Sequence, residues 1–303
     1  MDERRAGILL GLLAYTIWGF LTIYWKALHD LGPFQLIGAR IISSLVLLSV
    51  ILALTHRWRH LAPLARDRAL LGRVAMAAVL LTCNWTAYVW AVAHDDIIQT
   101  ALGYFIAPLG TVLIGVVVLG ERVRPAQRVA LGLAAVAVVE LTISYGRIPW
   151  IALLIAASWS LYGLFKRQVP LAPFESLTGE TLVLLLPAFL VLLVPAAHGN
   201  GLASQATGPQ MVLVALTGVA TTVPLVMFAG AARRVPFTLL GPMQYIVPSI
   251  NFLLGTLVYH EAIDASQLLG FALVWAGLAI FTVDGVRAGR TEPSSLEAAT
   301  VVS

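Results

Sequence analysis

The chain has 303 residues, of which 59% are hydrophobic and only 11% are charged, with a formal net charge of +4. Ordinary soluble domains contain about a quarter charged residues, so this composition excludes a fully soluble fold. The small basic excess gives no support to nucleic-acid binding. We therefore expect a protein whose solvent is the lipid bilayer.

Ten apolar segments each approach the roughly 20 residues that a helix needs to cross the hydrocarbon core. The fold class predicted is an all-α polytopic membrane protein with ten transmembrane helices. Cys83 is the only cysteine, so no disulfide or cysteine metal cluster is expected. The segments cover residues 7–25, 34–54, 71–93, 97–119, 126–145, 149–165, 176–197, 210–232, 237–258 and 267–285.

The distribution of basic residues predicts the orientation of the chain. If the N-terminus is cytoplasmic, sixteen of the 19 Lys and Arg residues fall on the cytoplasmic side. Lys26 and Arg147 fall on the other side, and Arg40 lies within a helix. Cytoplasmic loops are enriched in Lys and Arg, so we expect both termini to be cytoplasmic.

The two halves of the chain align when one is shifted by 140 residues. The motif "LGPFQLIGAR" at 31–40 matches "LAPFESLTGE" at 171–180, and "APLGTVLIGVVVLGERVRPAQ" at 107–127 matches "VPSINFLLGTLVYHEAIDASQ" at 247–267. Each half holds five segments, and an odd number makes the second half enter the membrane from the opposite side. Inverted repeats are typical of secondary transporters. The predicted division is a first five-helix repeat at 1–145, a second at 146–285 and a disordered tail at 286–303.

These features resemble a known family. The paired five-helix units, the "LGE" and "YHE" helix ends and the opening "GILLGLLAYTIWGFLTIYWKAL" resemble the ten-helix drug/metabolite transporters with EamA domains. The stretches "NWTAYVWAV" and "ALGYFIAPLGTVLIGVVVLGERV" resemble their RarD branch, the chloramphenicol-sensitivity proteins. The resemblance implies a multi-pass protein of the bacterial inner membrane that transports small metabolites or drugs. It also implies that helices 1, 3, 4, 6, 8 and 9 surround the central pathway.

Proline interrupts two predicted helices at matching positions of the two halves, which is the best sequence pointer to a transporter's binding site. Residues around each proline are spaced i, i+4, i+7 and therefore share one helix face. We expect both faces to line one central cavity. The alternative is a kinked packing helix whose polar groups bond to neighbouring helices. The candidate substrate-binding residues are Tyr104, Pro108, Thr111, Gln244, Pro248 and Asn251.

Three aromatic pairs near the middle of predicted helices add further candidate substrate contacts. Trp and Tyr usually gather at the membrane interface, so their central position is informative. Asn84, Thr221 and Thr222 lie at similar depth. For each single aromatic residue, packing against lipid or another helix is an equally good interpretation. The pairs are Tyr15 with Trp18, Trp85 with Tyr88, and Trp159 with Tyr162.

Arg40 is the only charged residue of segment 34–54, although an arginine deep in hydrocarbon costs roughly 3 kcal/mol on insertion scales. Its depth matches that of Glu140, which is therefore its predicted partner. Its repeat mate Glu180 matches Arg73 in depth instead. Snorkelling to the membrane surface is the alternative for Arg40. Glu180 is a candidate proton carrier, because desolvation favours the protonated carboxyl.

The predicted function is a secondary active exporter of small amphipathic molecules, such as amino acid derivatives or chloramphenicol-like drugs, by alternating access. No nucleotide motif of the G-x-x-x-x-G-K-[ST] type is found, so energy would come from an ion gradient, with protons as candidates, or from the substrate's own gradient. No convergent nucleophile and base appears, so neither enzyme activity nor a cofactor is expected. A membrane sensor or partner subunit that does not transport is the alternative.

Overall fold

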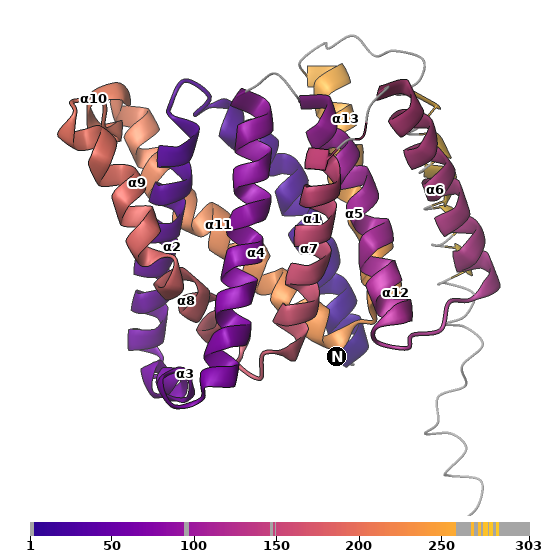
Figure 1. Cartoon of the computed structure of the whole chain (residues 1–303), viewed down its shortest axis with the longest axis horizontal. Helices are drawn as coiled ribbons and strands as arrows, with labels where there is room; N and C mark the ends of the chain where they lie inside the picture. Colours follow the sequence, from indigo (N-terminus) through magenta and orange to yellow (C-terminus); the bar gives the residue numbers. More distant parts are fainter. Residues whose placement is uncertain are drawn as a thin grey trace, which may run out of the picture. The chain divides into compact units, whose positions relative to one another are not determined.

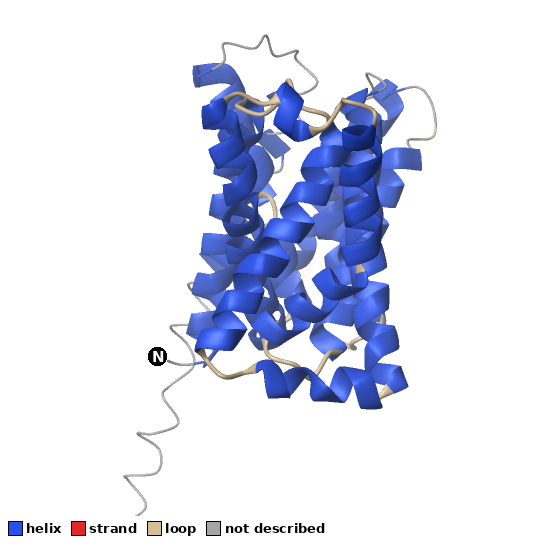
Figure 2. Ribbon diagram, turned by 90° about the vertical axis from the view of Figure 1, so that its left-hand side faces the viewer, coloured by secondary structure: helices blue, strands red, loops and turns tan. Residues whose placement is uncertain are grey.

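The structure is a computed structural model, and all regular structure in its described part is helical (Figure 2). The predicted tail at 286–303 lies outside the described residues. The described residues are 3–93, 97–145, 148, 150–258, 268, 269, 272, 273, 275–277, 279, 280, 283 and 284.

The helices follow one another along the chain with short connections (Figure 1). A 3-10 turn, η1 (Trp58–Leu61), precedes α3, and a π-helical turn, η2 (Leu254–Val258), follows α13. The α-helices are α1 (Glu3–Lys26), α2 (Pro33–Leu54), α3 (Ala62–Arg66), α4 (Arg68–Ala93), α5 (Ile97–Val117), α6 (Pro125–Tyr145), α7 (Trp150–Gln168), α8 (Pro173–Val183), α9 (Leu185–Ala197), α10 (Leu202–Gln205), α11 (Gly208–Arg234), α12 (Phe237–Met243) and α13 (Ile246–Leu253).

The first nine predicted segments each coincide with a helix or a series of helices in the described part of the chain. In the tenth, 267–285, the residues that the structure describes are helical as well. By length and composition alone, four described helices are long and apolar enough to cross a membrane, or up to five if the bent α8–α9 pair is one span. The four are α1, α2, the first 21 residues of α4, and α11.

The prediction of one continuous helix at 176–197 is wrong. The chain forms α8 and α9, which are bent by 49° at Leu184 (Figure 1). Pro187 supplies the reason: a proline ring clashes with the carbonyl group four residues earlier and provides no N–H for it. That carbonyl belongs to Val183, the last residue of α8.

The two proline-interrupted helices behave differently. α5 stays continuous through Pro108, whereas the second helix breaks into α12 and α13 between Met243 and Ile246. Pro248 cannot donate to the carbonyl of Gln244 four residues earlier, and Gln244 lies in this break. A matching sequence position therefore gives a continuous helix in one half and a broken one in the other.

The chain divides into two compact units, and each is described by itself. Unit 1 comprises residues 1–121 and 149–262, and unit 2 comprises 122–148 and 263–303. Within unit 1, α7 packs against α4 and α5, α1 packs against α11 and α13, and α2 packs against α11, α8 and α9. Within unit 2, Arg124 pairs with Asp284 at 3.1 Å. Both units combine segments of the two chain halves, so they are not the two predicted repeats.

The crossing of α2 and α11 in unit 1 requires glycine. A Cβ atom at Gly218 would lie 2.5 Å from the backbone carbonyl atoms of Ser43 and 2.8 Å from the amide nitrogen of Ser44. Beside this point the hydroxyl groups of Ser43 and Thr217 lie 2.9 Å apart. Small residues that allow such close backbone approach, together with hydroxyl contacts, are typical of helix pairs in membranes.

Candidate functional site

Five aromatic side chains from α1, α7 and α11 pack together in unit 1. The ring centroid of Trp18 lies 5.3 Å from that of Trp159 and 5.8 Å from that of Phe228. Such pairs contribute about 0.5–1.5 kcal/mol each beyond the area they bury. We name this group the aromatic cluster: Tyr15, Trp18, Trp159, Tyr162 and Phe228. Sequence reasoning missed Phe228, because a single Phe in an apolar helix has no distinguishing pattern.

The two tyrosines of the aromatic cluster differ in their hydrogen bonds. Both are buried, with Tyr15 2% exposed and Tyr162 0% exposed. The Tyr162 hydroxyl donates to Glu180 Oε2 at 3.2 Å, whereas the Tyr15 hydroxyl has no partner among the described residues. A buried unpaired hydroxyl costs about 1–3 kcal/mol. Tyr15 therefore offers an unused polar group beside an aromatic surface.

Lys166 at the end of α7 and Glu180 on α8 form a buried ion pair. Their side chains are only 1% exposed, and Lys166 Nζ contacts Glu180 Oε1. The Ser176 hydroxyl donates to the same carboxylate oxygen at 3.2 Å. The prediction that Arg73 is the partner of Glu180 is wrong. Arg73 is exposed on α4, and Lys166 is the cation that contacts the Glu180 carboxylate.

Arg40 on α2 has aromatic neighbours instead of a carboxylate. Its Cζ lies 3.9 Å from the ring centroid of Trp85 and 5.0 Å from that of Trp25. Its Nε donates to the Thr221 hydroxyl at 3.1 Å. Within the described part of unit 1, no carboxylate forms an ion pair with it. Glu140 belongs to unit 2, so the pairing of Arg40 with Glu140 stays a prediction.

Tyr88 and Tyr104 extend the aromatic surroundings of Arg40. Their ring centroids lie 6.2 Å apart, across the α4–α5 contact, and Tyr88 lies about one helical turn after Trp85. Through Tyr88, Tyr104 thus continues the series of rings that begins at Trp85. Trp85, which lies over the guanidinium group, also packs against the hydrophobic core that contains Tyr15, Tyr162 and Phe228.

The structure brings together the two faces that contain Pro108 and Pro248. Gln244 Nε2 donates to the Thr111 hydroxyl at 2.7 Å, and both residues are buried. Two hydroxyl groups also donate hydrogen bonds to backbone carbonyls near Pro108. Ser160 donates to Ala107 O, and Tyr245 donates to Phe105 O, each at 3.2 Å. The carbonyl that Pro108 leaves without an N–H donor is that of Tyr104, four residues earlier, so these two bonds attach α5 to its neighbours near the proline but do not replace the lost one. In this arrangement Gln244 and Thr111 bond to each other, as the packing alternative requires.

The remaining predicted amides also form bonds between helices. Asn84 Nδ2 donates to Ile155 O at 2.9 Å and to the Ser158 hydroxyl at 3.2 Å, joining α4 to α7. Asn251 Oδ1 accepts from the Thr22 hydroxyl at 2.7 Å, joining α13 to α1. Both amides therefore hold helices of unit 1 together in this conformation.

Glu121, which follows α5, fixes the start of α12. Its carboxylate accepts from the backbone N–H groups of Phe237 and Thr238 at 3.0 and 2.8 Å. It also pairs with Arg167 Nη1 at 3.0 Å. A carboxylate at a helix N-terminus satisfies unpaired N–H groups and interacts favourably with the helix dipole. Glu121 thus links α5, α7 and α12.

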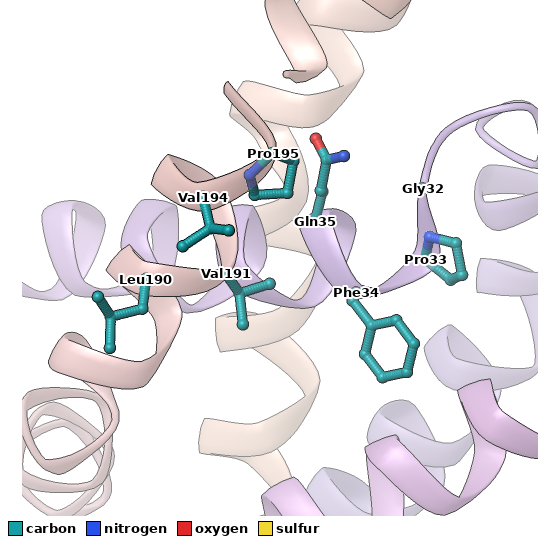
Figure 3. A pocket seen from close by; sticks show the side chains of 8 residues that line it. All are labelled: Gly32, Pro33, Phe34, Gln35, Leu190, Val191, Val194 and Pro195. Carbon is teal, nitrogen blue, oxygen red and sulfur yellow. The ribbon is translucent and has the colours of Figure 1, made fainter. Parts of the chain in front are cut away.

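Two cavities of unit 1 lie away from the predicted substrate residues. One, of about 490 Å³, lies between the start of α2 and α9 (Figure 3). Its lining is apolar apart from Gln35, whose amide oxygen is buried without a partner among the described residues. The other, of about 360 Å³, is polar. It is lined by Arg57, Arg59, His60, Pro63, Pro170, Leu171, Ala172 and Glu175.

Comparison with known proteins identifies the class. The model of the EamA-like transporter family matches residues 5–143 and, a second time, residues 147–283. The chain therefore belongs to the EamA-like family of membrane transporters. One crystal structure is similar with a TM-score of 0.68 and 22% sequence identity, over 91% of this chain and 97% of the chain in that structure. This likeness concerns the fold alone.

Similar proteins identify the branch of this family to which the chain belongs. Protein RarD of Streptomyces exfoliatus is 42% identical over 298 residues, covering 98% of this chain and 95% of the relative. The uncharacterized transporter YojE of Bacillus subtilis is 35% identical, covering 96% and 98%. The chloramphenicol-sensitive protein RarD of Pseudomonas aeruginosa is 26% identical, covering 94% and 96%. The chain is a multi-pass membrane transporter of the RarD branch of drug/metabolite transporters.

Proposed function

We propose that this protein is a secondary active transporter that exports small amphipathic metabolites or drugs by alternating access between two inverted repeats. The repeats are residues 1–145 and 146–285. Membership of the EamA-like family supports transport of small molecules. The substrate classes are amino acid derivatives and chloramphenicol-like compounds. The second class draws on the name of one relative, a chloramphenicol-sensitive protein.

The observation that carries the proposal is that residues related by the repeat touch each other. Trp18 and Trp159, related by a shift of 141, have ring centroids 5.3 Å apart. Phe105 and Tyr245, related by a shift of 140, have centroids 6.3 Å apart. Two equivalent residues can touch only near the axis that relates the repeats. These pairs therefore support a pseudo-twofold axis through the middle of unit 1, where transporters of this design bind substrate.

The packing of the helices follows the same symmetry. The contact of α1 with α11 corresponds to that of α7 with α4, and the contact of α1 with α13 corresponds to that of α7 with α5. Alternating access requires one repeat to rock against the other about such an axis. The break between α12 and α13 provides a point where this movement can bend the chain.

In this proposal the aromatic cluster and the paired proline faces line the substrate pathway. Opening the repeats separates Gln244 from Thr111 and uncovers the Tyr15 hydroxyl. The pathway then offers aromatic surfaces with a few polar groups, which suits an amphipathic molecule.

We assign the coupling proton to Glu180. Its carboxylate is held by Lys166, Tyr162 and Ser176. A proton taken up by Glu180 neutralises the carboxylate and releases Lys166, whose ammonium in the last turn of α7 can then turn toward water, so α7 and α8 can separate without leaving either charge unpaired in a medium of low dielectric constant. Both termini are placed in the cytoplasm, because that orientation gives the observed excess of basic residues on the inner side.

The test is flux into proteoliposomes that contain only this protein, measured with a library of amphipathic metabolites and drugs under an imposed pH gradient. We expect at least one compound to move in a protein-dependent manner, faster when the gradient is applied. Empty liposomes and liposomes with an unrelated helical membrane protein are the controls. Absence of flux for every compound, with the protein folded and correctly inserted, would favour a sensor or partner subunit.

A further inference from the structure

Arg40 is a cation whose charge nothing in the described part of unit 1 neutralises. Its guanidinium group lies over Trp85 and near Trp25, and ring contacts of this kind stabilise the face of the group. These ring contacts do not satisfy the N–H groups at its edge. An unpaired charge inside a membrane-spanning helix is costly. Because no carboxylate in the described part of unit 1 pairs with Arg40, we expect an anion from outside the protein to do so.

The donors of Arg40 are largely unused. A guanidinium group has five N–H donors in a fixed planar fork. The Nε–H is bonded to Thr221, which fixes the direction of the fork, and the structure gives the two terminal nitrogens no acceptor among the described residues. Arg40 is only half-buried, and its terminal nitrogens are not sealed inside the protein. The edge that can hold a carboxylate with two parallel bonds therefore stays open.

Beside the guanidinium group the protein presents aromatic rings. Trp85 and Tyr88 come from α4, Tyr104 from α5, and Trp25 from the end of α1. A ligand that pairs with Arg40 must place the body next to its anionic group against these rings. The site thus combines one strong cationic fork with an apolar wall.

We propose that Arg40 binds the carboxylate of the transported molecule, and that the substrate class is an amphipathic carboxylic acid whose apolar body packs against Trp85 and Tyr104. This inference rests on the proposed transport function and makes it more specific. Among the two substrate classes, it selects amino acid derivatives with a free carboxylate over neutral chloramphenicol-like compounds. Arg40 is then a specificity-determining residue rather than a coupling charge.

The experiment compares two molecules that differ at the anionic group. Binding of N-acetylphenylalanine and of its neutral amide, N-acetylphenylalaninamide, is measured by isothermal titration calorimetry on the purified full-length protein in detergent. We expect the acid to bind about 10- to 100-fold more tightly than the amide, as charge-assisted hydrogen bonds provide. Arg40→Gln should abolish this preference, and Arg40→Lys should keep part of it, because lysine retains the charge without the fork.

Arg66→Gln is the matched control, since Arg66 is an exposed residue of α3 and its substitution lowers the net charge equally. The preference for the acid should be unchanged in it. If Arg40→Gln does not fold, Thr221→Val replaces it, because loss of the Nε contact should lower the acid preference several-fold. An equal affinity of the wild-type protein for acid and amide would overturn the inference. So would an acid preference that survives Arg40→Gln or, where that variant does not fold, Thr221→Val.

Two further results distinguish this inference from lipid binding at Arg40 and from the proposed transport function. Displacement of the bound acid by micellar phosphatidylglycerol at lower concentration than by a second carboxylic acid would assign Arg40 to a lipid phosphate and overturn the inference. Acid binding that depends on Arg40, without flux of any compound in proteoliposomes, would leave the carboxylate site in place and contradict the transport function instead.

Discussion

Positions 40 and 180 are equivalent in the two repeats, yet they hold opposite charges in different surroundings. Glu180 is buried and has a lysine, a tyrosine and a serine as partners. Arg40 is half-buried and contacts two tryptophans and a threonine. The lysine of the first site, Lys166, lies in the last turn of α7, and the last turn of the corresponding helix α1 also holds a lysine, Lys26.

The same position in two repeats can thus have two functions, formation of an internal ion pair at Glu180 and binding of an external anion at Arg40. With an acidic residue at 180, the lysine at 166 completes a neutral, hydrogen-bonded pair that the protein can bury. With a basic residue at 40, Lys26 at the end of α1 and Arg40 are both cationic, and no such pair can form between them. One half thus contains its own counter-charge, whereas we infer that the other obtains it from the substrate.

The largest effect is expected at the neutral pair. Lys166→Met leaves the Glu180 carboxylate buried without a cation, which costs about 3–5 kcal/mol. We expect most of the folded protein to be lost, measured by thermal unfolding in detergent and size-exclusion profile. The double substitution Lys166→Met with Glu180→Gln removes both charges and should recover a large part of the loss. Equal instability of the single and double variants would contradict a pair that is neutralised internally.

An intermediate effect is expected where α2 crosses α11 beside Arg40 and Thr221. Gly218→Ala places a methyl group 2.5 Å from the backbone of Ser43, and overpacking of this kind costs about 1–3 kcal/mol. Its unfolding temperature should fall. Gly72→Ala is the control, because nothing lies within 4 Å of a Cβ at that position. A Gly218→Ala variant as stable as Gly72→Ala would show that this crossing does not hold Arg40 in place.

The smallest effect concerns Arg40 in the absence of ligand. Arg40→Ala removes ring contacts that contribute about 0.5–2 kcal/mol, but it also removes a charge from the bilayer. A double-mutant cycle with Glu140→Ala decides between two hypotheses. An Arg40 reserved for substrate predicts additive changes in unfolding free energy, within about 0.5 kcal/mol. A larger coupling energy would instead support the Arg40–Glu140 pair that helix depth predicts.

Much of the architecture could be predicted from the sequence, because hydrocarbon thickness fixes the length of apolar segments. Nine segments therefore matched described helices. The bend at Leu184 was missed because Pro187 lies in a segment whose length and apolar character alone suggest one continuous span. The contrast between α5 and the α12–α13 break was not accessible either, because Pro108 and Pro248 occupy matching sequence positions and only the fold shows that α5 continues through its proline.

The candidate site was less accessible to sequence reasoning. Depth along a helix gave Arg73 as the partner of Glu180, because depth specifies a level in the membrane but not the direction in which a side chain points. Lys166 was counted only as a cytoplasmic basic residue. A lysine near the end of both helices, Lys26 in α1 and Lys166 in α7, was the available signal. The aromatic pairs were found by spacing, but only the fold joins Tyr15, Trp18, Trp159 and Tyr162 through Phe228.

The most direct test of the division between these two charged sites is uptake of radiolabelled N-acetylphenylalanine into proteoliposomes, once as exchange without a pH gradient and once with one. The Arg40→Gln variant should lose both the exchange and the uptake driven by the gradient. Glu180→Gln cannot titrate, and when it is combined with Lys166→Met, so that no buried ammonium is left without its carboxylate, it should retain exchange and lose the stimulation by the gradient. If both variants lose the same mode to the same extent, or if Glu180→Gln keeps its full dependence on the gradient, the two sites do not have the separate roles proposed.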